Sequence, residues 1–231
     1  MNYRNKQKNI FQAMEKAFKK GKVKTTIVKM LSNYANDNQI CLTTVIFIPK
    51  YLSEKIQEKT IKLLKDIDLT QYFYQPISFH ITIQNIRTIH QPPLFTKNDL
   101  ERIKKAFSKI IPQYQPIKFE IKGILELPTS LSLKVFSGQE HHDLTMSLRR
   151  TLDQIGVLDN KTYFSDNVVL GNITICRYTQ KPNEAFQKKV KDLKDIEIGR
   201  FTTDEVHLIT TNAVCHPNKT VIIKTFNLCG E

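Results

Sequence analysis

The sequence predicts an α+β fold in which two similar lobes of antiparallel sheet, with helices packed outside, form one compact unit. From residue 39 onward, strand-like and helix-like segments follow each other in the order β-α-β-α-β-β-α-β-α-β-β. Several strands are joined by short connections, which favour antiparallel pairing over an all-parallel sheet. Of the 231 residues, 40% are hydrophobic, enough to bury a core, and no linker rich in Gly, Ser or Pro divides the chain.

Residues 1–38 are expected to form a basic helical extension ahead of the main domain, 39–231. They carry a net charge of +7 out of +13 for the whole chain. Apolar residues recur there at helical spacing and predict an amphipathic helix over about 8–20: Ile10, Phe11, Met14, Ala17 and Phe18. Two interpretations stay open. The helix packs on the main domain with its lysines in water, or the basic segment contacts nucleic acid.

Strands are predicted in runs that are apolar and rich in β-branched residues. Seven such runs occur: 40–49, 77–86, 117–126, 130–136, 168–177, 205–209 and 221–226. The turn between the third and fourth contains Pro128, a residue that interrupts strand pairing.

Four helices are predicted between these strands. Ser53 is expected to cap the first, with Leu63 and Leu64 on its apolar face, and Thr96 to cap the second, which runs to about Pro112. The third, 141–155, has one apolar stripe, and the fourth, 184–196, is rich in lysine.

Two of the predicted strands contain similar motifs, FHITI at 79–83 and GNITI at 171–175. Because residues i and i+2 of a strand project from the same face, His80 lies beside Thr82, and Asn172 beside Thr174. The isoleucines between them then point the other way, into a core. One strand therefore presents an imidazole and a hydroxyl, and the other a carboxamide and a hydroxyl.

These motifs resemble those of the 2H phosphoesterases, a family that includes 2′-5′ RNA ligase-like proteins and cyclic phosphodiesterases and is named for two His-x-Thr-x motifs. The first motif matches at His80 and Thr82, and the second has Asn172 in place of histidine before Thr174. Arg177 closes a NITICR run that looks like the family's second-motif strand. The last two predicted strands look like its closing hairpin. The similarity covers about residues 39–228.

The resemblance implies a cleft between the two lobes that holds a 2′,3′-cyclic phosphate or a 2′-5′ phosphodiester at an RNA end. One histidine acts as general base and the other protonates the leaving oxygen, while the threonine hydroxyls donate to phosphate oxygens. Histidine suits both roles because its pKa lies near neutral pH. The reaction needs no metal and no cofactor. Arg177 is expected either to hold a phosphate oxygen or to form a surface salt bridge.

Asn172 departs from the family pattern, since an amide does not titrate near neutral pH. Losing one proton-transfer group costs about 10²–10⁴ in rate. Three outcomes stay open: slow catalysis by His80 alone, a substitute residue, or an RNA-binding protein without turnover. The leading hypothesis is an impaired phosphoesterase, and the alternative is a catalytically inactive RNA-binding protein on the same fold. A third interpretation is an unrelated α+β protein in which the two motifs coincide by chance.

Other polar residues are weaker candidates. His207 is a conceivable substitute, although a strand histidine is usually structural. His141 and His142 are expected to be exposed at the start of a helix, and Tyr163 and Ser165 lie in a loop that could reach substrate. The two remaining histidines, in turn-like stretches with proline, are expected to do nothing chemical: His90 and His216.

The composition suggests a partner and a compartment. A net charge of +13 favours phosphate-bearing partners, here RNA or a nucleotide. The four cysteines form no CxxC pair and no zinc-ligand pattern, so buried free thiols are expected. The amino terminus lacks a secretory h-region, and no apolar run reaches the ~20 residues of a membrane span. We therefore expect a cytoplasmic monomer that does not bind membranes.

Overall fold

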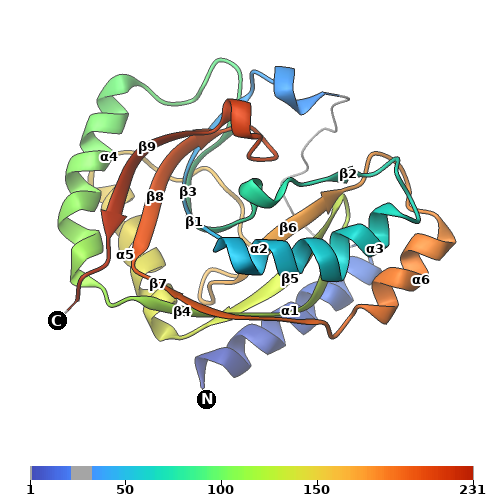
Figure 1. The fold of residues 1–231 in the computed structure, drawn as a ribbon. Helices are drawn as coiled ribbons and strands as arrows, with labels where there is room; N and C mark the ends of the chain where they lie inside the picture. Colours follow the sequence, from blue (N-terminus) through green and yellow to red (C-terminus); the bar gives the residue numbers. More distant parts are fainter. Residues whose placement is uncertain (1, 22–32, 231) are drawn as a thin grey trace.

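The computed structural model describes residues 2–21 and 33–230, and it shows an α+β fold built on two antiparallel sheets (Figure 1). The first sheet has the order β3-β1-β8-β9, with β1 (Ile40–Phe47), β3 (His80–His90), β8 (Glu205–Thr211) and β9 (Val221–Asn227). The second has the order β2-β6-β5-β4-β7, with β2 (Tyr72–Phe73), β4 (Ile117–Leu127), β5 (Ser130–Ser137), β6 (Gly171–Arg177) and β7 (Glu197–Thr203). The two motifs thus lie on different sheets, as the two-lobed prediction requires.

Helices cover the outer faces of these sheets, except the amino-terminal helix, which packs on the other face of the second sheet in a separate apolar cluster (Figure 1). Their bounds are α1 (Tyr3–Lys19), α2 (Lys50–Ile56), α3 (Lys62–Lys65), α4 (Lys97–Ile110), α5 (Gln139–Gln154) and α6 (Glu184–Asp192). On the first sheet, α5 packs on β3, and α4 packs on β9 and on α5. On the second sheet, α1 packs on β4 and β5, while α2 packs on β7 and α3 on α6. The predicted α+β class with helices outside the sheets is confirmed.

The apolar residues at alternate positions of the two motif strands pack into the core. On β3 and just before it, Phe79, Ile81 and Ile83 are buried, and on β6 Ile173 and Ile175 are fully buried. These side chains belong to one hydrophobic cluster that reaches across both sheets. Because the apolar positions of each strand face this cluster, the polar positions between them face the other way.

Two sequence signals for helices were accurate. Thr96 caps α4 in a capping box, in which its hydroxyl accepts from the backbone N–H of Asp99 and the Asp99 carboxylate accepts from the backbone N–H of Thr96. The apolar stripe of α5 is fully buried: Leu144, Leu148 and Leu152.

The predicted cap of the preceding helix was wrong. That helix begins at Lys50, after Pro49, so Ser53 lies inside it and is not its cap. The Ser53 hydroxyl donates to the carbonyl of Ile48 at 3.2 Å. A π-helical segment (Gln57–Ile61) joins α2 to α3. Its extra residue rotates the following turn, so that Leu64 is buried while Leu63 is 37% exposed.

Two strands were missed, and three predicted strands extend past their observed ends, at 48–49, 77–79 and 168–170. The missed strands are β7, which contains Gly199, and the two-residue β2, and neither has an uninterrupted apolar alternation. The predicted strand at 168–177 begins only at Gly171. The backbone of Val169 is instead hydrogen-bonded to α1. Its carbonyl accepts from the Tyr3 hydroxyl and from the side-chain amide of Gln7.

The amino-terminal helix is docked on the second sheet. Phe11 and Met14 pack with Leu125 and Phe136 in a separate small cluster. Two ion pairs flank this cluster, Arg4 with Glu120 and Glu15 with Lys134. Four lysines of this helix point into solvent: Lys6, Lys8, Lys16 and Lys19. The described part of the extension is therefore docked on the main domain, and contact of its lysines with nucleic acid stays a prediction. Three further basic residues lie outside the described residues: Lys22, Lys24 and Lys29.

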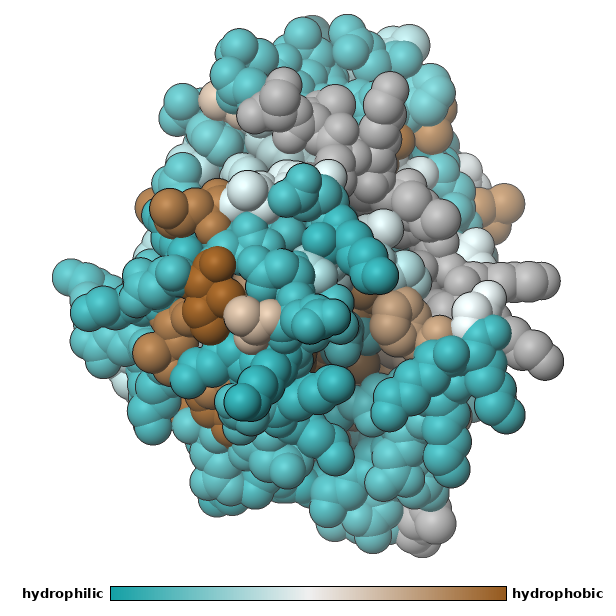
Figure 2. All heavy atoms as spheres, turned by 90° about the vertical axis from the view of Figure 1, so that its right-hand side faces the viewer, coloured by the Kyte–Doolittle hydropathy of each residue, from teal (hydrophilic) through white to brown (hydrophobic). Residues whose placement is uncertain are grey.

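The surface is mainly hydrophilic on the face seen in Figure 2, with apolar residues breaking it only in places. Among the described residues, no helix has the length and apolar character required to cross a membrane. Two of the four cysteines depart from the expectation of buried free thiols, because Cys229 is exposed and Cys41 is only partly buried. Cys215 is buried in the loop after β8, with a left-handed φ of 51°.

Candidate functional site

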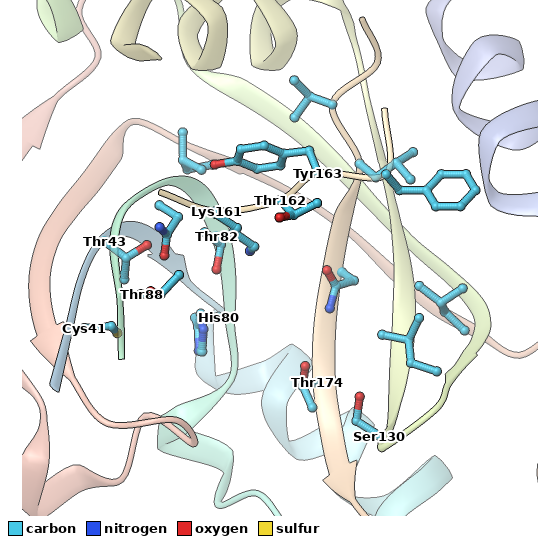
Figure 3. Close-up of a pocket in the computed structure, with 18 of the residues that line it drawn as sticks. Cys41, Thr43, His80, Thr82, Thr88, Ser130, Lys161, Thr162, Tyr163 and Thr174 are labelled. Atoms are coloured by element: carbon cyan, nitrogen blue, oxygen red, sulfur yellow. The ribbon is translucent and has the colours of Figure 1, made fainter. Parts of the chain in front are cut away.

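The two motifs line one cavity of about 350 Å³ between the sheets (Figure 3). Strands β3 and β6 pack side by side, so each presents its polar face to the same space. All five residues singled out from the sequence line this cavity: His80, Thr82, Asn172, Thr174 and Arg177. The structure thus brings the imidazole, the carboxamide and both motif hydroxyls together.

His80 is held in a defined orientation at the start of β3. Its Nδ1 lies 2.8 Å from the carbonyl oxygen of Ser78, and since a carbonyl only accepts, Nδ1 donates. The other ring nitrogen, Nε2, is therefore the atom that can take or release a proton.

The thiol of Cys215 is the main electrostatic neighbour of His80. Burial and the nearby Lys161 lower the pKa of His80, but the interaction with Cys215, strongest when that thiol is deprotonated, and the bond to the Ser78 carbonyl outweigh them and raise it. Conversely, burial would raise the pKa of Cys215, but His80 and hydroxyl donors, including Thr220 at 3.5 Å, lower it. The two groups therefore favour each other's charged form, which favours an imidazolium at position 80.

On β6 the polar face is a short chain of neutral groups. The Asn172 amide donates to the hydroxyl of Ser132 at 3.3 Å, and that hydroxyl donates to the Thr174 hydroxyl at 3.3 Å. Ser132 lies opposite Thr174 on the neighbouring strand β5. This side of the cavity can donate and accept hydrogen bonds, but none of its three groups titrates near neutral pH.

Arg177 makes contacts that the sequence did not indicate, and its expected role in holding a phosphate oxygen stays a prediction. Its Nε donates to the Tyr74 hydroxyl and its Nη2 to the carbonyl of Ala213, both at 3.0 Å. Ala213 follows β8 of the first sheet, so the guanidinium at the end of β6 ties the two lobes together. Among the described residues, Arg177 forms no salt bridge, and these two hydrogen bonds fix its guanidinium. The side chain still lines the cavity.

Several cavity residues were missed by sequence reasoning. The most relevant are Lys161, in the loop between α5 and β6, and Cys215. A loop lysine in a lysine-rich chain carries no pattern that distinguishes it, and Cys215 lies far from both motifs. Tyr163 and Ser165, which were expected to reach substrate, do line the cavity from the same loop as Lys161.

The amino-terminal helix also contributes to the cavity. Phe11 and Met14 of α1 form part of its wall, beside Phe164 and Leu170. This end of the cavity is apolar, in contrast to the polar faces of β3 and β6.

The other histidines lie elsewhere. His141 was expected to be exposed but is fully buried, because it is three residues before Leu144 on the inner stripe of α5. His142, next to it, is partly buried and contacts the ring of Tyr3 at 5.4 Å. His207 bonds to the Thr225 hydroxyl at 2.9 Å on the neighbouring strand, in keeping with a structural role. In the described ranges, no group of three His, Cys, Asp or Glu side chains is placed to hold a metal ion.

Solved structures share this architecture, although no family model and no curated protein matches the sequence. The protein TT0787 of Thermus thermophilus superposes with a TM-score of 0.60 at 14% identity, over 83% of this chain and 99% of that one. A phosphoesterase gives 0.56 at 12% identity, over the same shares of the two chains. LigT of E. coli, solved with 3′-AMP, gives 0.57 at 11% identity, again over 83% and 99%.

These neighbours define the class of fold. They are members of the 2H phosphoesterase superfamily. At identities of 10–14% the likeness concerns the fold, and the chain has the two-lobed 2H phosphoesterase fold.

Proposed function

We propose that this chain is a 2H phosphoesterase-like protein that acts on 2′,3′-cyclic phosphates or 2′-5′ phosphodiesters at RNA ends, without a metal, and that Asn172 impairs its catalysis. The observation that carries the proposal is the convergence of His80 and Thr82 with Asn172 and Thr174 on one cavity from opposite sheets.

The proposed chemistry follows from the two faces of the cavity. A nucleophilic oxygen, from water in hydrolysis, attacks phosphorus, and the bond from phosphorus to the 2′ or 3′ oxygen breaks. The leaving oxygen takes a proton from Nε2 of His80, whose raised pKa favours the protonated form that this step needs. The nucleophile's proton passes to water, because Asn172 cannot accept it.

The threonines are proposed to stabilise the charge that grows on phosphate during the reaction. Thr82 and Thr174 sit on opposite sheets and each carries a hydroxyl that can donate to a non-bridging oxygen. Two further features support a nucleotide ligand. LigT has been solved with 3′-AMP and with phosphate, and the chain carries a net charge of +13.

The alternative is an RNA-binding protein without turnover on the same fold. Asn172 favours it, since the second motif has no group that titrates near neutral pH. The exposed lysines of α1 also favour it, because they add positive charge beside the second sheet.

Turnover of a 2′,3′-cyclic nucleotide tests these two functions. We expect slow hydrolysis by the unchanged protein, none by His80→Ala, and a rise in rate toward the ~10²–10⁴-fold that a second proton-transfer group contributes for Asn172→His. His207→Ala is the matched control, because it removes a strand histidine outside the cavity. Equal turnover with and without the His80 imidazole would exclude His80 from the mechanism. Inert proteins that bind RNA with steep salt dependence would establish the alternative.

A further inference from the structure

We propose that Lys161 binds the phosphate of the ligand, supplying on the β3 side of the cavity the positive charge that the second motif lacks. This inference deepens the proposed function and rests on it. Figure 3 shows Lys161 entering the cavity from its loop, on the side from which His80 and Thr82 also point.

The loop that carries Lys161 is fastened to the strand that carries His80. Asp159 accepts from the side-chain amides of Gln84 at 2.6 Å and Asn85 at 3.1 Å, both on β3. Asn160 exchanges two hydrogen bonds with Thr88, farther along the same strand, at 2.9 and 3.1 Å. The position of Lys161 relative to the first motif is therefore set by the residues directly before it.

The nearest carboxylate is already occupied by other donors. Besides the two amides of β3, Asp159 accepts from the Tyr163 hydroxyl and from the backbone N–H of Lys161 at 2.8 Å. Within the described residues, no carboxylate lies within 4.0 Å of the Lys161 ammonium, and no hydrogen bond reaches it. Its ammonium lies 5.7 Å from the centroid of the Tyr163 ring.

The neighbouring cation is used differently. Arg149 stacks on the ring of Tyr163 at 4.1 Å and lies 3.4 Å from the side-chain oxygen of Gln84. Its guanidinium thus holds the loop in place, and the ammonium of Lys161 is left to face the cavity.

An ammonium in this environment favours an anionic ligand. Burial lowers the pKa of Lys161, an effect that Asp159 opposes and Arg149 reinforces. Lys161 is only partly buried, and an anion beside a partly desolvated ammonium offsets the cost of that desolvation. A phosphate between His80 and the β6 hydroxyls would be such an anion, and it would receive charge-assisted hydrogen bonds in return.

Binding of 3′-AMP and of inorganic phosphate, measured by isothermal titration calorimetry, tests this role. Replacing Lys161 by methionine keeps the length of the side chain and removes the charge, and we expect affinity for both ligands to fall about 10- to 100-fold. Lys161→Arg should keep most of the affinity. Lys118→Met, an exposed lysine of β4 outside the cavity, is the matched control and should change affinity less than about twofold.

The outcomes separate this inference from the proposed function. Unchanged affinity in Lys161→Met would overturn the role of Lys161, whatever the turnover. If Lys161→Met loses affinity and the unchanged protein hydrolyses no cyclic nucleotide, the phosphate-binding role of Lys161 is supported and the proposed enzymatic activity is contradicted. If Lys161→Met unfolds, Lys161→Gln gives the same test, and retained affinity in a folded Gln variant would equally refute the role.

Discussion

Replacing His141 by glutamine should make this protein less sensitive to acid. His141 is fully buried on the inner face of α5, with its ring edge against Phe119 at 5.2 Å between centroids. Its Nδ1 lies 2.8 Å from the hydroxyl of Ser137, and its Nε2 has no hydrogen-bond partner in the described parts of the chain. Burial, together with the neighbouring His142, lowers the pKa of His141 to about 3.

The size of the effect follows from this pKa. In the unfolded chain, His141 binds a proton below about pH 6.5, but in the folded protein it stays neutral down to about pH 3. Between these values the unfolded state binds more protons, so the free energy of unfolding falls by about 1.4 kcal/mol for each pH unit of acidification. From pH 7 to pH 4.5, His141 should therefore remove about 2–3 kcal/mol of stability, of the order of a third of a typical domain's total.

Urea unfolding at pH 7 and at pH 4.5 measures this directly. Glutamine keeps an amide that can bond to Ser137 but cannot titrate, so the variant should lose about 2–3 kcal/mol less than the unchanged protein on acidification. At pH 7 the variant should be the less stable one, because it loses the ring packing against Phe119. His90→Gln, which removes an exposed histidine at the end of β3, should keep the original pH dependence.

Parallel losses of stability in the unchanged protein and in His141→Gln would refute the reasoning. Carboxylates also contribute to acid unfolding, since hydrogen bonds lower the pKa of Asp68 and Asp99. Their contribution is the same in both proteins, so the difference between the two isolates position 141.

Two further predictions concern contacts that the sequence did not indicate or only partly indicated. Arg177→Met removes the bonds to Tyr74 and Ala213 that join the lobes, and it should lower the free energy of unfolding by about 1.5–3 kcal/mol in urea; unchanged stability would show that these bonds do not hold the lobes. Thr96→Ala removes half of the capping box with Asp99 and should cost about 1 kcal/mol in the same assay, whereas a loss below about 0.2 kcal/mol would show that α4 needs no cap.

The fold was largely predictable because most of its elements carry local signals. Period-two alternation defined β3 and β6, and the side chains at alternate positions face the core and the cavity as expected. The capping box at Thr96 and the stripe at Leu144, Leu148 and Leu152 are likewise short-range patterns. Each of these depends on residues within a few positions of one another, and a single sequence shows such relations directly.

What the sequence did not show depends on contacts between distant segments. The strand β7 is held by pairing with β4, some 80 residues earlier, and Val169 is taken up by Tyr3 and Gln7 of α1 instead of a strand partner. His141 is an instructive error. Its spacing of three residues from Leu144 placed it on the apolar stripe, but its polarity and its position at the start of the helix suggested exposure.

The candidate site likewise has residues that the sequence indicated and residues that it did not. This difference affects how the replacement of histidine by Asn172 is interpreted. The polar pairs of β3 and β6 followed from the sequence, but the charges around them come from a loop and from the segment after β8, through Lys161 and Cys215. The motif residues of β6 and their partner Ser132 are all neutral, and the guanidinium of Arg177 at the end of that strand is held by Tyr74 and Ala213. The β3 face, in contrast, has an imidazole held toward its charged form and an ammonium without a carboxylate partner among the described residues.

This asymmetry has a consequence for Asn172→His. In a symmetric site, a new imidazolium would add charge that phosphate binding needs, and affinity would rise together with turnover. Here Lys161 and His80 would already balance the charge of a bound phosphate, so a histidine at position 172 should raise turnover much more than affinity. A variant in which affinity for 3′-AMP rises about 10-fold or more while turnover stays flat would instead mean that the site lacked charge and not a proton carrier.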